Sequence, residues 1–425
     1  IFHFIDEELF KEIFELFDTS MAMDLNKVTT GILTITIFLV IANIIIRQHF
    51  DSIDAAHLND ELEMNSGGKI MLQTPGRSRE NGSEPWLNEE IALKPCWNTT
   101  TVFKDCMDHP KGFVTFSLTN GPEYHFYQVA DAFVVARHLK ATLILPDIRG
   151  STAGGTRKFR ELYDEEFFEQ SVKGLVNIKY ELPAEVYDTA VVKVPTRLND
   201  EYIRHNVEPI FKKRGSIRLA SNFPSRNMRK SKNTVMGESD SLACLGMFTS
   251  LKMNKKITRM ADLMITQLRT MSFKSRFIAI DLRQATTIRN TYSEKRFNPK
   301  QIARFLKNIG FSKDTVIYAT ENNNHLKEAF PRTYTKGELG NWEQVGDARG
   351  EVVGRAIDLY ICSRSDVFVP AGGGMFYTNV VGQRVTKGKT EVLVPASVPG
   401  GSTQAVNHLS PYISKKSHVA YTCFC

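Results

Sequence analysis

The stretch FVTFSLTNGPEYHFYQVADAFVVARHLKATLILP, residues 113–146, decides the fold class of this chain. Phe113–Leu118 at its start and Thr142–Pro146 at its end are short, mostly apolar runs typical of buried strands. Between them, Gln128–Lys140 is predicted to be a helix, because apolar residues recur close to one face: Val129, Phe133, Ala136 and Leu139. A strand, a helix and a strand in succession predict two parallel neighbouring strands.

The C-terminal part of the chain repeats this alternation. Its predicted strands are Arg276–Leu282, Thr315–Ala319, Asp366–Pro370 and Glu391–Pro395, and its predicted helices are Pro299–Ile309, Glu351–Cys362 and Met375–Val381. The helix at 299–309 has the clearest ends, since Asn298 can cap it, Pro299 suits its first turn and Gly310 follows its last turn. Between the two regions, the pattern predicts a strand at Ala190–Val194 and a long helix at Asn254–Ser272.

Strands that alternate with helices indicate an α/β protein with mostly parallel sheets covered on both faces. Two such units in series predict two Rossmann-like domains that face a cleft, over residues 94–272 and 273–425. Ligands of sheets of this kind bind beyond the carboxyl ends of the strands.

A membrane anchor is predicted ahead of these domains. Residues 28–46, VTTGILTITIFLVIANIII, carry no charge, and as a helix they would span about 28 Å, close to the apolar thickness of a bilayer. This predicted signal anchor separates a cytosolic tail, 1–27, from a polar stem, 47–93. A start at Met21 or Met23 would make residues 1–20 a gene-model artefact.

The globular part is predicted to be lumenal. Asn81 and Asn98 begin glycosylation acceptor triplets. Cys96 and Cys106 could close a small disulfide loop in an oxidising compartment. For the pair Cys423 and Cys425, a disulfide and free thiols are both compatible with the sequence.

Composition narrows the function classes. The 425-residue chain has a net charge of +7, with Lys and Arg spread along it, which fits either a solvated surface or an anionic ligand such as a nucleotide-sugar. The sequence shows no signature of nucleic-acid binding. It contains no Asp-x-Asp, no HExxH, no GxSxG and no zinc-type cysteine spacing, so neither a metal nor a cofactor is expected.

Two candidate sites lie where a predicted strand ends. Glu123 and His125, between the strand at 113–118 and the following helix, are the nearest acid/base candidates there, although an ordinary turn with solvated side chains explains them too. Arg283 ends the strand at 276–282 and could hold a phosphate through two hydrogen bonds, whereas the alternative is an ordinary surface arginine.

Two more candidates lie around the strand at 366–370. Asp358, Ser365 and Asp366 could bind a nucleobase, ribose or phosphate, or they could cap local backbone N–H groups. The glycine run at 372–374 could cradle a phosphate, but it lacks the Lys and the Ser or Thr of a P-loop.

At these residues the sequence resembles the plant O-fucosyltransferase-like family, and within it the mannan-synthesis-related branch. The likeness runs from about Gly112 to the C-terminus. Its segments are SLTNGPEYH with VADAFVVARHLKATLILPDIRGS (within 117–151), KVPTR (193–197), RFIAIDLR (276–283), AFPRTYTK (329–336), SRSDVFVPA (363–371) and SPYISKKSHVAYTCFC (410–425).

This resemblance implies a GT-B-like fold with an N-terminal acceptor domain and a C-terminal donor domain, held in the Golgi as a single-pass type II protein. It also implies an inverting, metal-independent transfer from a GDP-sugar, with fucose as the sugar. By the same resemblance Arg283 matches the arginine that holds the donor diphosphate, and Asp358 matches an aspartate of the donor site. The segment at the nucleotide corresponds to Ser365, Asp366 and Phe368.

Three segments depart from the family pattern. The usual His-x-Arg reads Asp281-Leu282-Arg283, the first-domain turn lacks its arginine near Phe126, and residues 284–297 do not match the usual loop. The first hypothesis is therefore a transferase in which Glu123 or His125 takes the proton of a glycan acceptor. The second is a non-catalytic accessory protein that binds a mannan synthase or its product. The third is a lectin-like domain without a donor.

Overall fold

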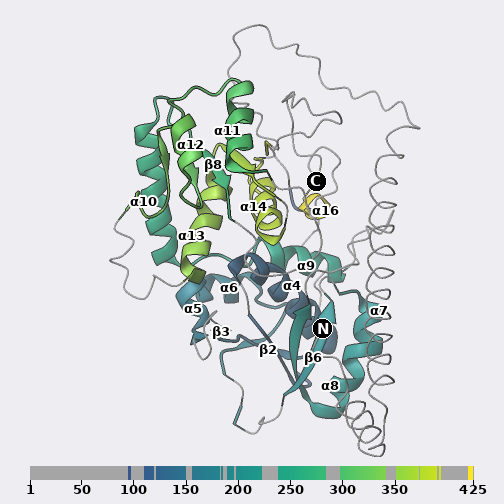
Figure 1. The fold of residues 1–425 in the computed structure, drawn as a ribbon. Helices are drawn as coiled ribbons and strands as arrows, with labels where there is room; N and C mark the ends of the chain where they lie inside the picture. The colour runs from purple at the N-terminus through teal and green to yellow at the C-terminus, as the bar shows by residue number, and fades with distance from the viewer. Residues whose placement is uncertain are drawn as a thin grey trace, which may run out of the picture. The chain divides into compact units, whose positions relative to one another are not determined.

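The computed structural model describes thirteen stretches of the chain: residues 94–96, 110–118, 121–149, 156–181, 183–184, 189–195, 198–222, 238–283, 297–340, 351–372, 374–389, 392–393 and 420–424. All belong to one compact unit, residues 84–425, drawn as coloured ribbon in Figure 1. The predicted tail, anchor and stem, both glycosylation acceptors and Cys106 lie outside the described residues. Within the described stretches, no helix combines the length and apolar character needed to cross a membrane.

The first sheet has five parallel strands in the order β5-β2-β1-β7-β6. Its strands are β1 (Phe113–Phe116), β2 (Thr142–Ile144), β5 (Ile178–Lys179), β6 (Ala190–Pro195) and β7 (Ser216–Asn222). Helix α4 (Pro122–Leu139) joins β1 to β2, and Phe113 pairs with Thr142. The predicted strand–helix–strand unit is confirmed, although α4 begins six residues before the predicted start at Gln128.

The second sheet has four parallel strands in the order β10-β9-β8-β11. They are β8 (Ile278–Asp281), β9 (Ile317–Ala319), β10 (Thr333–Tyr334) and β11 (Val367–Pro370). The helices of this part are α11 (Pro299–Asn308), α12 (Asn324–Ala329), α13 (Glu351–Arg364) and α14 (Met375–Val385). Of the strand predicted at 391–395, only residues 392–393 are described, and Val392 forms a parallel bridge with Phe368 of β11.

Helix α11 begins and ends as its sequence predicts. The Asn298 side chain accepts a hydrogen bond from the Gln301 N–H at 2.8 Å, and the Gln301 side chain accepts one from the Asn298 N–H at 2.9 Å. Gly310 follows with φ of 103°, the left-handed conformation that glycine adopts without steric cost. Its buried face carries Ile302, Ala303, Phe305 and Leu306.

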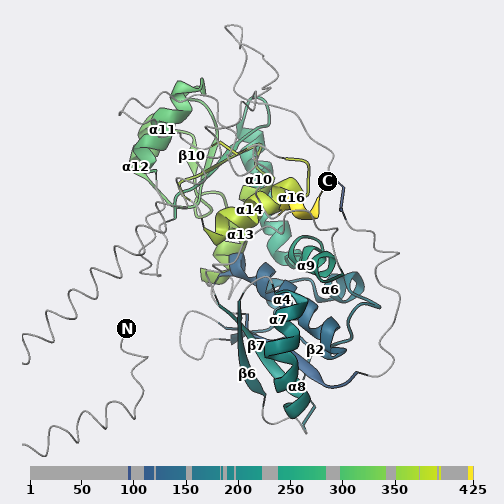
Figure 2. The ribbon, with the colours of Figure 1, turned by 90° about the vertical axis from the view of Figure 1, so that its right-hand side faces the viewer.

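Helix α4 lies at the centre of the core. It packs on β1, β2 and β7 of the first sheet, on α13 and α14 beside the second sheet, and on α9 (Glu238–Phe248). Figure 2 shows α4 between these layers. Its approach to α9 is close, because a Cβ on Gly246 would lie 2.9 Å from the Ala130 Cα. The long helix α10 (Lys255–Met271) packs against α13, so it contributes to the layer beside the second sheet.

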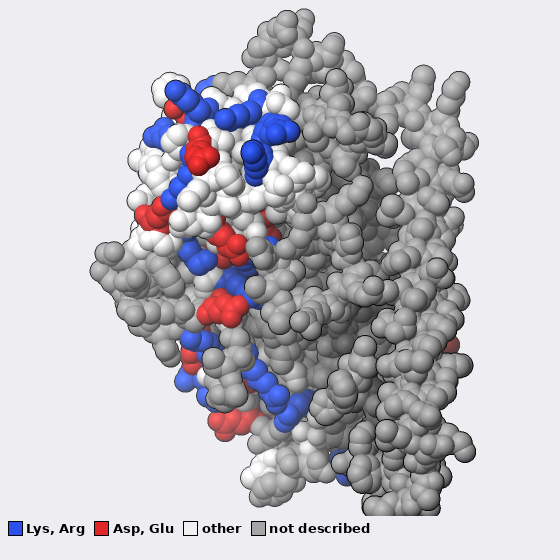
Figure 3. Space-filling view, in the orientation of Figure 1, with Lys and Arg blue, Asp and Glu red and all other residues white. Residues whose placement is uncertain are grey.

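The remaining described elements are short. They are β3 (Ile148–Arg149), β4 (Thr156–Arg157), α5 (Phe159–Leu162), α6 (Glu165–Ser171), α7 (Asp200–Tyr202), a π-helical turn (Ile203–Val207), α8 (Glu208–Arg214) and α16 (Ala420–Cys423). On the face shown in Figure 3, basic and acidic side chains of the described residues are interspersed. That pattern is the one expected of a solvated surface.

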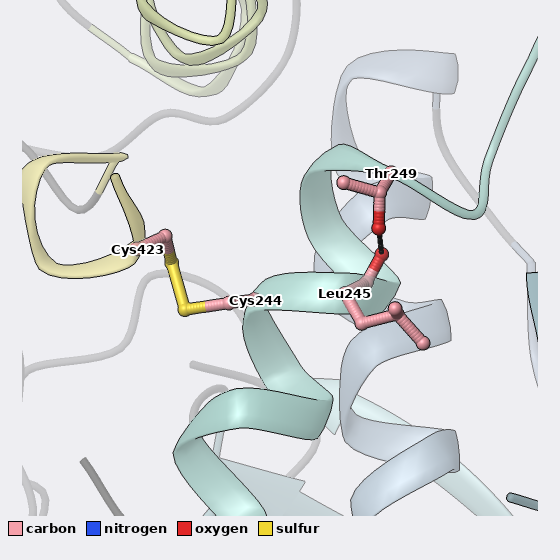
Figure 4. Close-up of a disulfide and its surroundings, with 4 residues drawn as sticks. All are labelled: Cys244, Leu245, Thr249 and Cys423. Atoms are coloured by element: carbon pink, nitrogen blue, oxygen red, sulfur yellow. Dashed lines mark hydrogen bonds between the residues drawn. A yellow bond between two sulfur atoms is a disulfide. The ribbon is translucent and has the colours of Figure 1, made fainter. Parts of the chain in front are cut away.

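A disulfide from Cys244 in α9 to Cys423 in α16 ties the C-terminal segment to the helical layer (Figure 4). The two cysteines are 179 positions apart in sequence, and α16 packs on both α9 and α14. Cys96 is also disulfide-bonded, to a partner outside the described residues, so its predicted pairing with Cys106 stays a prediction. Cys362 is a buried free thiol.

Breaking this bond should destabilise the fold, because the bond restricts the unfolded chain over a long loop. We expect Cys244→Ala to lower the free energy of unfolding by roughly 2–5 kcal/mol, measured by denaturant titration. The double variant Cys244→Ala/Cys423→Ala should be no less stable than the single one, because one substitution already removes the bond. Unchanged stability in both variants would contradict the prediction.

Candidate functional site

The predicted site lies at the carboxyl edge of the second sheet. Because β8, β9 and β11 are parallel neighbours, Asp281, Ala319 and Pro370 all end at this edge. Arg283 follows β8 by two residues, and α14 begins five residues after β11 ends, at Met375. The edge therefore brings together an arginine and a helix N-terminus, two groups that suit an anion.

The Arg283 side chain is fixed before any ligand arrives. Its Nε donates a hydrogen bond to Asp281 Oδ1 at 3.1 Å, and its guanidinium carbon lies 3.4 Å from the centre of the Phe376 ring. Burial opposes the charge, but the carboxylates of Asp281, Asp358 and Glu123 outweigh that effect and raise the pKa of Arg283. A rigid cation of this kind is suited to a phosphate.

Asp358 lies behind this edge and is closed to ligands. Its side chain is 1% exposed, and its two carboxylate oxygens accept hydrogen bonds from the Tyr318 hydroxyl at 2.6 Å and from Lys336 Nζ at 2.9 Å. Burial raises the pKa of Asp358, against the opposing effect of Lys336 and Arg283. Asp358 therefore holds other side chains in place, and of these Lys336 keeps 23% of its side chain exposed.

Glu123 reaches the same region from the first sheet's side. It sits in the first turn of α4, and its Oε1 accepts a hydrogen bond from Arg355 of α13 at 3.0 Å. Its Oε2 is buried and has no hydrogen-bond partner among the described residues. The carboxylate folds back onto Gly121, where a Cβ would lie 2.1 Å from Oε2. A glycine is thus needed at position 121 for this carboxylate position.

His125 points elsewhere. It is fully buried, with Nδ1 at 2.7 Å from the hydroxyl of Tyr163 and the two rings edge to face. Burial raises the pKa of Tyr163 well above its ordinary value, and the charge of Glu123 adds to that shift. Of the two predicted acid/base residues, Glu123 is therefore the one whose charge acts on Arg283.

The structure does not bring Ser365, Asp366 and Phe368 to this group. Ser365 and Asp366 precede β11, so its four positions, about 13 Å of extended chain, separate them from the edge where Arg283 follows β8. Phe368 is the second residue of β11 and pairs with Ala279. Ser365 Oγ donates to the Cys362 carbonyl, Asp366 accepts from the Phe277 N–H, and the Phe368 ring is in the core. Both polar side chains thus make structural contacts, Ser365 at the end of α13 and Asp366 to the residue that precedes β8, and neither caps a local N–H group among the described residues.

The predicted glycine run does lie at the edge. Gly374 precedes α14 with φ of 111°, and no side chain caps this helix end. Gly372 precedes it, and Gly373 lies outside the described residues. Among the described residues, no group of three or more His, Cys, Asp or Glu side chains could hold a metal ion.

Several residues of the edge were not predicted as site residues: Tyr318, Glu321, Lys336, Arg355 and Phe376. Glu321 follows β9, and burial raises its pKa. Lys336 ends the segment AFPRTYTK, one of those that carry the family resemblance. The sequence therefore offered a signal for Lys336. The place of the other four residues at the site follows from which strands are neighbours, and the sequence does not show that order.

Comparison with known proteins decides the family. The model of the family "GDP-fucose protein O-fucosyltransferase" matches residues 127–387. MANNAN SYNTHESIS-RELATED 1 of Arabidopsis thaliana is 43% identical, over 95% of this chain and 100% of its own length. The chain belongs to the O-fucosyltransferase family. MANNAN SYNTHESIS-RELATED of Trigonella foenum-graecum is 38% identical over 95% of this chain and 100% of its own length, which places the chain in the mannan-synthesis-related branch.

The solved structures to which this chain is similar share little sequence with it. POFUT1 in complex with GDP is 14% identical with a TM-score of 0.43, over 67% of this chain and 99% of that one. The fucosyltransferase NodZ from Bradyrhizobium is 14% identical with a TM-score of 0.36, over 64% of this chain and 93% of that one.

This member of the O-fucosyltransferase family has Asp281 where the family pattern has histidine, and the structure shows what the aspartate does. Its Oδ1 binds Arg283 Nε and also accepts a hydrogen bond from the Thr320 hydroxyl at 3.1 Å. The Thr320 hydroxyl oxygen accepts in turn from the Leu282 N–H at 2.9 Å. Asp281 thus orients the arginine, at the cost of one added negative charge.

The Glu123–Arg355 pair should depend on Gly121. A double-mutant cycle with Glu123→Ala and Arg355→Met should give a coupling energy of about 1–3 kcal/mol in the unfolding free energy. In a Gly121→Ala background the coupling should vanish, because the new Cβ displaces the carboxylate.

Gly340→Ala is the matched control for this cycle. A Cβ at position 340 meets Met264 Cε at 3.7 Å, an ordinary contact, so the coupling should be retained. Full coupling in the Gly121→Ala background would contradict the close approach of the Glu123 carboxylate to Gly121.

Proposed function

We propose that this chain is an inverting, metal-independent glycosyltransferase that moves fucose from GDP-fucose to a glycan acceptor during cell-wall polysaccharide synthesis. Membership of a family described as GDP-fucose protein O-fucosyltransferase supports the donor, and the names of the mannan-synthesis-related relatives support the cell-wall role. The two parallel sheets support a GT-B-like arrangement in which the first carries the acceptor and the second the donor. We further propose a Golgi location, with the unit at 84–425 lumenal.

One observation carries the proposal: a fixed cation and a buried carboxylate follow the carboxyl ends of strands in the two sheets, Arg283 after β8 and Glu123 in the first turn of α4 after β1. Arg283, held by Asp281 and Phe376, lies at the donor edge with the N-terminus of α14. Arg355 binds Glu123 of α4 to α13, the helix that also carries Asp358 of the donor edge. A transferase needs both, a cation for the leaving diphosphate and a base for the acceptor.

The reaction that these residues support is a single displacement. The acceptor hydroxyl oxygen attacks the anomeric carbon of the donor, and the bond from that carbon to the diphosphate oxygen breaks with its electron pair. GDP leaves, and the hydroxyl proton passes to Glu123 Oε2. Arg283 stabilises the charge that develops on the diphosphate, without first having to change position.

A second candidate function is a non-catalytic accessory protein that supports mannan synthesis by binding a synthase or its product. The observation that favours it is that each cation of the edge already has a carboxylate partner: Asp281 for Arg283, Asp358 for Lys336 and Glu123 for Arg355. A site that had lost its donor would keep such pairs for stability alone. The two functions differ in whether the edge still binds GDP.

Titration of the full-length chain in detergent with GDP and with UDP should separate them. We expect GDP to bind and UDP not to bind, and Arg283→Ala to abolish GDP binding and lower fucose transfer by roughly 10²–10³-fold. Calorimetry measures the binding, and transfer of labelled fucose to mannan-type acceptors measures the activity.

Arg364→Ala is the matched control, because the Arg364 guanidinium lies 3.4 Å from the Tyr360 ring centre, the same stacking distance as Arg283 on Phe376, but at the other end of α13. It should bind GDP as the wild type does. A folded wild type that binds neither nucleotide would favour the accessory function.

If Glu123 is the catalytic base, its substitution should lower turnover without weakening donor binding. Glu123→Gln keeps a side chain that can bind Arg355 but cannot take a proton, so turnover should fall roughly 10²–10⁴-fold while GDP affinity stays unchanged. Glu351→Gln is the control, since Glu351 bonds the same arginine from an exposed position. Equal turnover in the two variants would remove Glu123 from the mechanism.

A further inference from the structure

Lys336 is the most unusual cation of the donor edge. It follows β10 by two residues, and its side chain crosses α13 at Gly354, where a Cβ would lie 3.2 Å from Lys336 Cε. Its ammonium group ends 2.9 Å from Asp358 Oδ2. The glycine thus leaves room for a lysine to reach a carboxylate that is otherwise buried.

The Lys336 side chain is held in place yet partly exposed. Asp358 is held from its other side by the Tyr318 hydroxyl, so the carboxylate cannot turn away from Lys336. A lysine ammonium carries three donor protons, and the bond to Asp358 needs only one of them. With 23% of its side chain exposed, Lys336 can offer the others to a ligand.

Lys336 and Arg283 lie at the same edge of the second sheet. Arg283 follows β8 and Lys336 follows β10, the two parallel neighbours of β9, so both come after the carboxyl ends of their strands. The charges of both also oppose the rise that burial causes in the pKa of Asp358 and of Glu321, which follows β9. Two cations lie near two common carboxylates, beside the start of α14, which no side chain caps. The positive charge of such a site suits a diphosphate better than a single phosphate. The leaving group of a nucleotide-sugar carries at least two negative charges, and without a metal ion the protein itself must balance them.

We propose that Lys336 is the second cation of the donor site, which binds the diphosphate together with Arg283, and that Asp358 is the residue that positions it. This inference rests on the proposed function for the identity of the donor. It assigns Asp358 a role different from direct contact with the nucleotide, because its carboxylate is closed off by Tyr318 and Lys336.

The chain offers a matched control in a second lysine pair of the same region. Lys327 pairs with Glu338, and the Lys327 side chain is 29% exposed, close to the value for Lys336. Lys327 is on α12, and its charge is not among those that act on Glu321 or Asp358. Its removal deletes a lysine and an ion pair while leaving both Arg283 and Lys336 in the chain.

The test is calorimetric titration of the full-length wild type, Lys336→Met, Lys336→Arg and Lys327→Met with GDP, guanosine and inorganic pyrophosphate. We expect Lys336→Met to weaken GDP and pyrophosphate binding by roughly 10- to 100-fold and to leave guanosine binding unchanged. Lys336→Arg keeps the charge and should bind both phosphate ligands nearly as the wild type does, as should Lys327→Met. Thermal unfolding of each variant identifies any that has lost its fold. If Lys336→Met does not fold, the affinities of Lys336→Arg and the wild type for the phosphate ligands are compared instead.

Three outcomes separate the two proposals. Wild-type affinity for GDP in folded Lys336→Met would overturn the role of Lys336 and leave the transferase proposal standing. Lys336-dependent binding of pyrophosphate without binding of GDP would support the cation pair and overturn the GDP-sugar donor. A folded wild type that binds none of the phosphate ligands would overturn both.

Discussion

Burial of the Asp358 carboxylate constrains the whole carboxyl edge of the second sheet. A charge in the interior costs several kcal/mol unless it is paired and hydrogen-bonded. The fold meets this demand from two sides, with the Tyr318 hydroxyl from β9 and the Lys336 ammonium from the segment after β10. Gly354 leaves the space through which the lysine passes. One buried carboxylate thereby fixes β9, the end of β10 and α13 relative to each other.

Helix α13 also connects Asp358 to the helix that packs on the first sheet. One turn before Asp358, Arg355 binds Glu123 in the first turn of α4, so the two sheets share a charged contact at the site. The opposite end of α13 is held by Arg384, which is fully buried and donates hydrogen bonds to the carbonyls of Ser365 and Asp366. A cation at a helix C-terminus also favours the helix dipole. Because both ends are bound, α13 holds Glu123 and Asp358 in a set relation to each other.

The sequence predicted the individual helices and strands of this fold well, but it did not predict which strands lie side by side. Apolar runs, helical spacing and caps gave β1, α4, β2, α10 and α11 nearly as they are, because those signals are local. Strand β7, residues 216–222, lies beside β1 about a hundred positions earlier in the chain, and no local pattern reports such a pairing. The same limit applies to the site. Arg283 and Glu123 were found from strand ends, but Ser365 and Asp366 looked equally suitable until the register put them at the opposite edge of the sheet.

The charge balance of the edge bears on what kind of binding it can achieve. Among the described residues there, Asp281, Asp358, Glu123 and Glu321 stand against Arg283, Lys336 and Arg355, so the carboxylates exceed the cations by one. A diphosphate would gain little from the long-range field of such a site, and its binding must come from short, directed contacts to cations already in position. Aspartate at position 281 adds to this effect, since it orients Arg283 while lowering the attraction for the donor. Catalysis depends on interactions that strengthen in the transition state, when charge on the diphosphate grows. Weak attraction for the bound donor combined with fixed cations is therefore compatible with turnover, and the aspartate does not by itself argue for a site that has lost its chemistry.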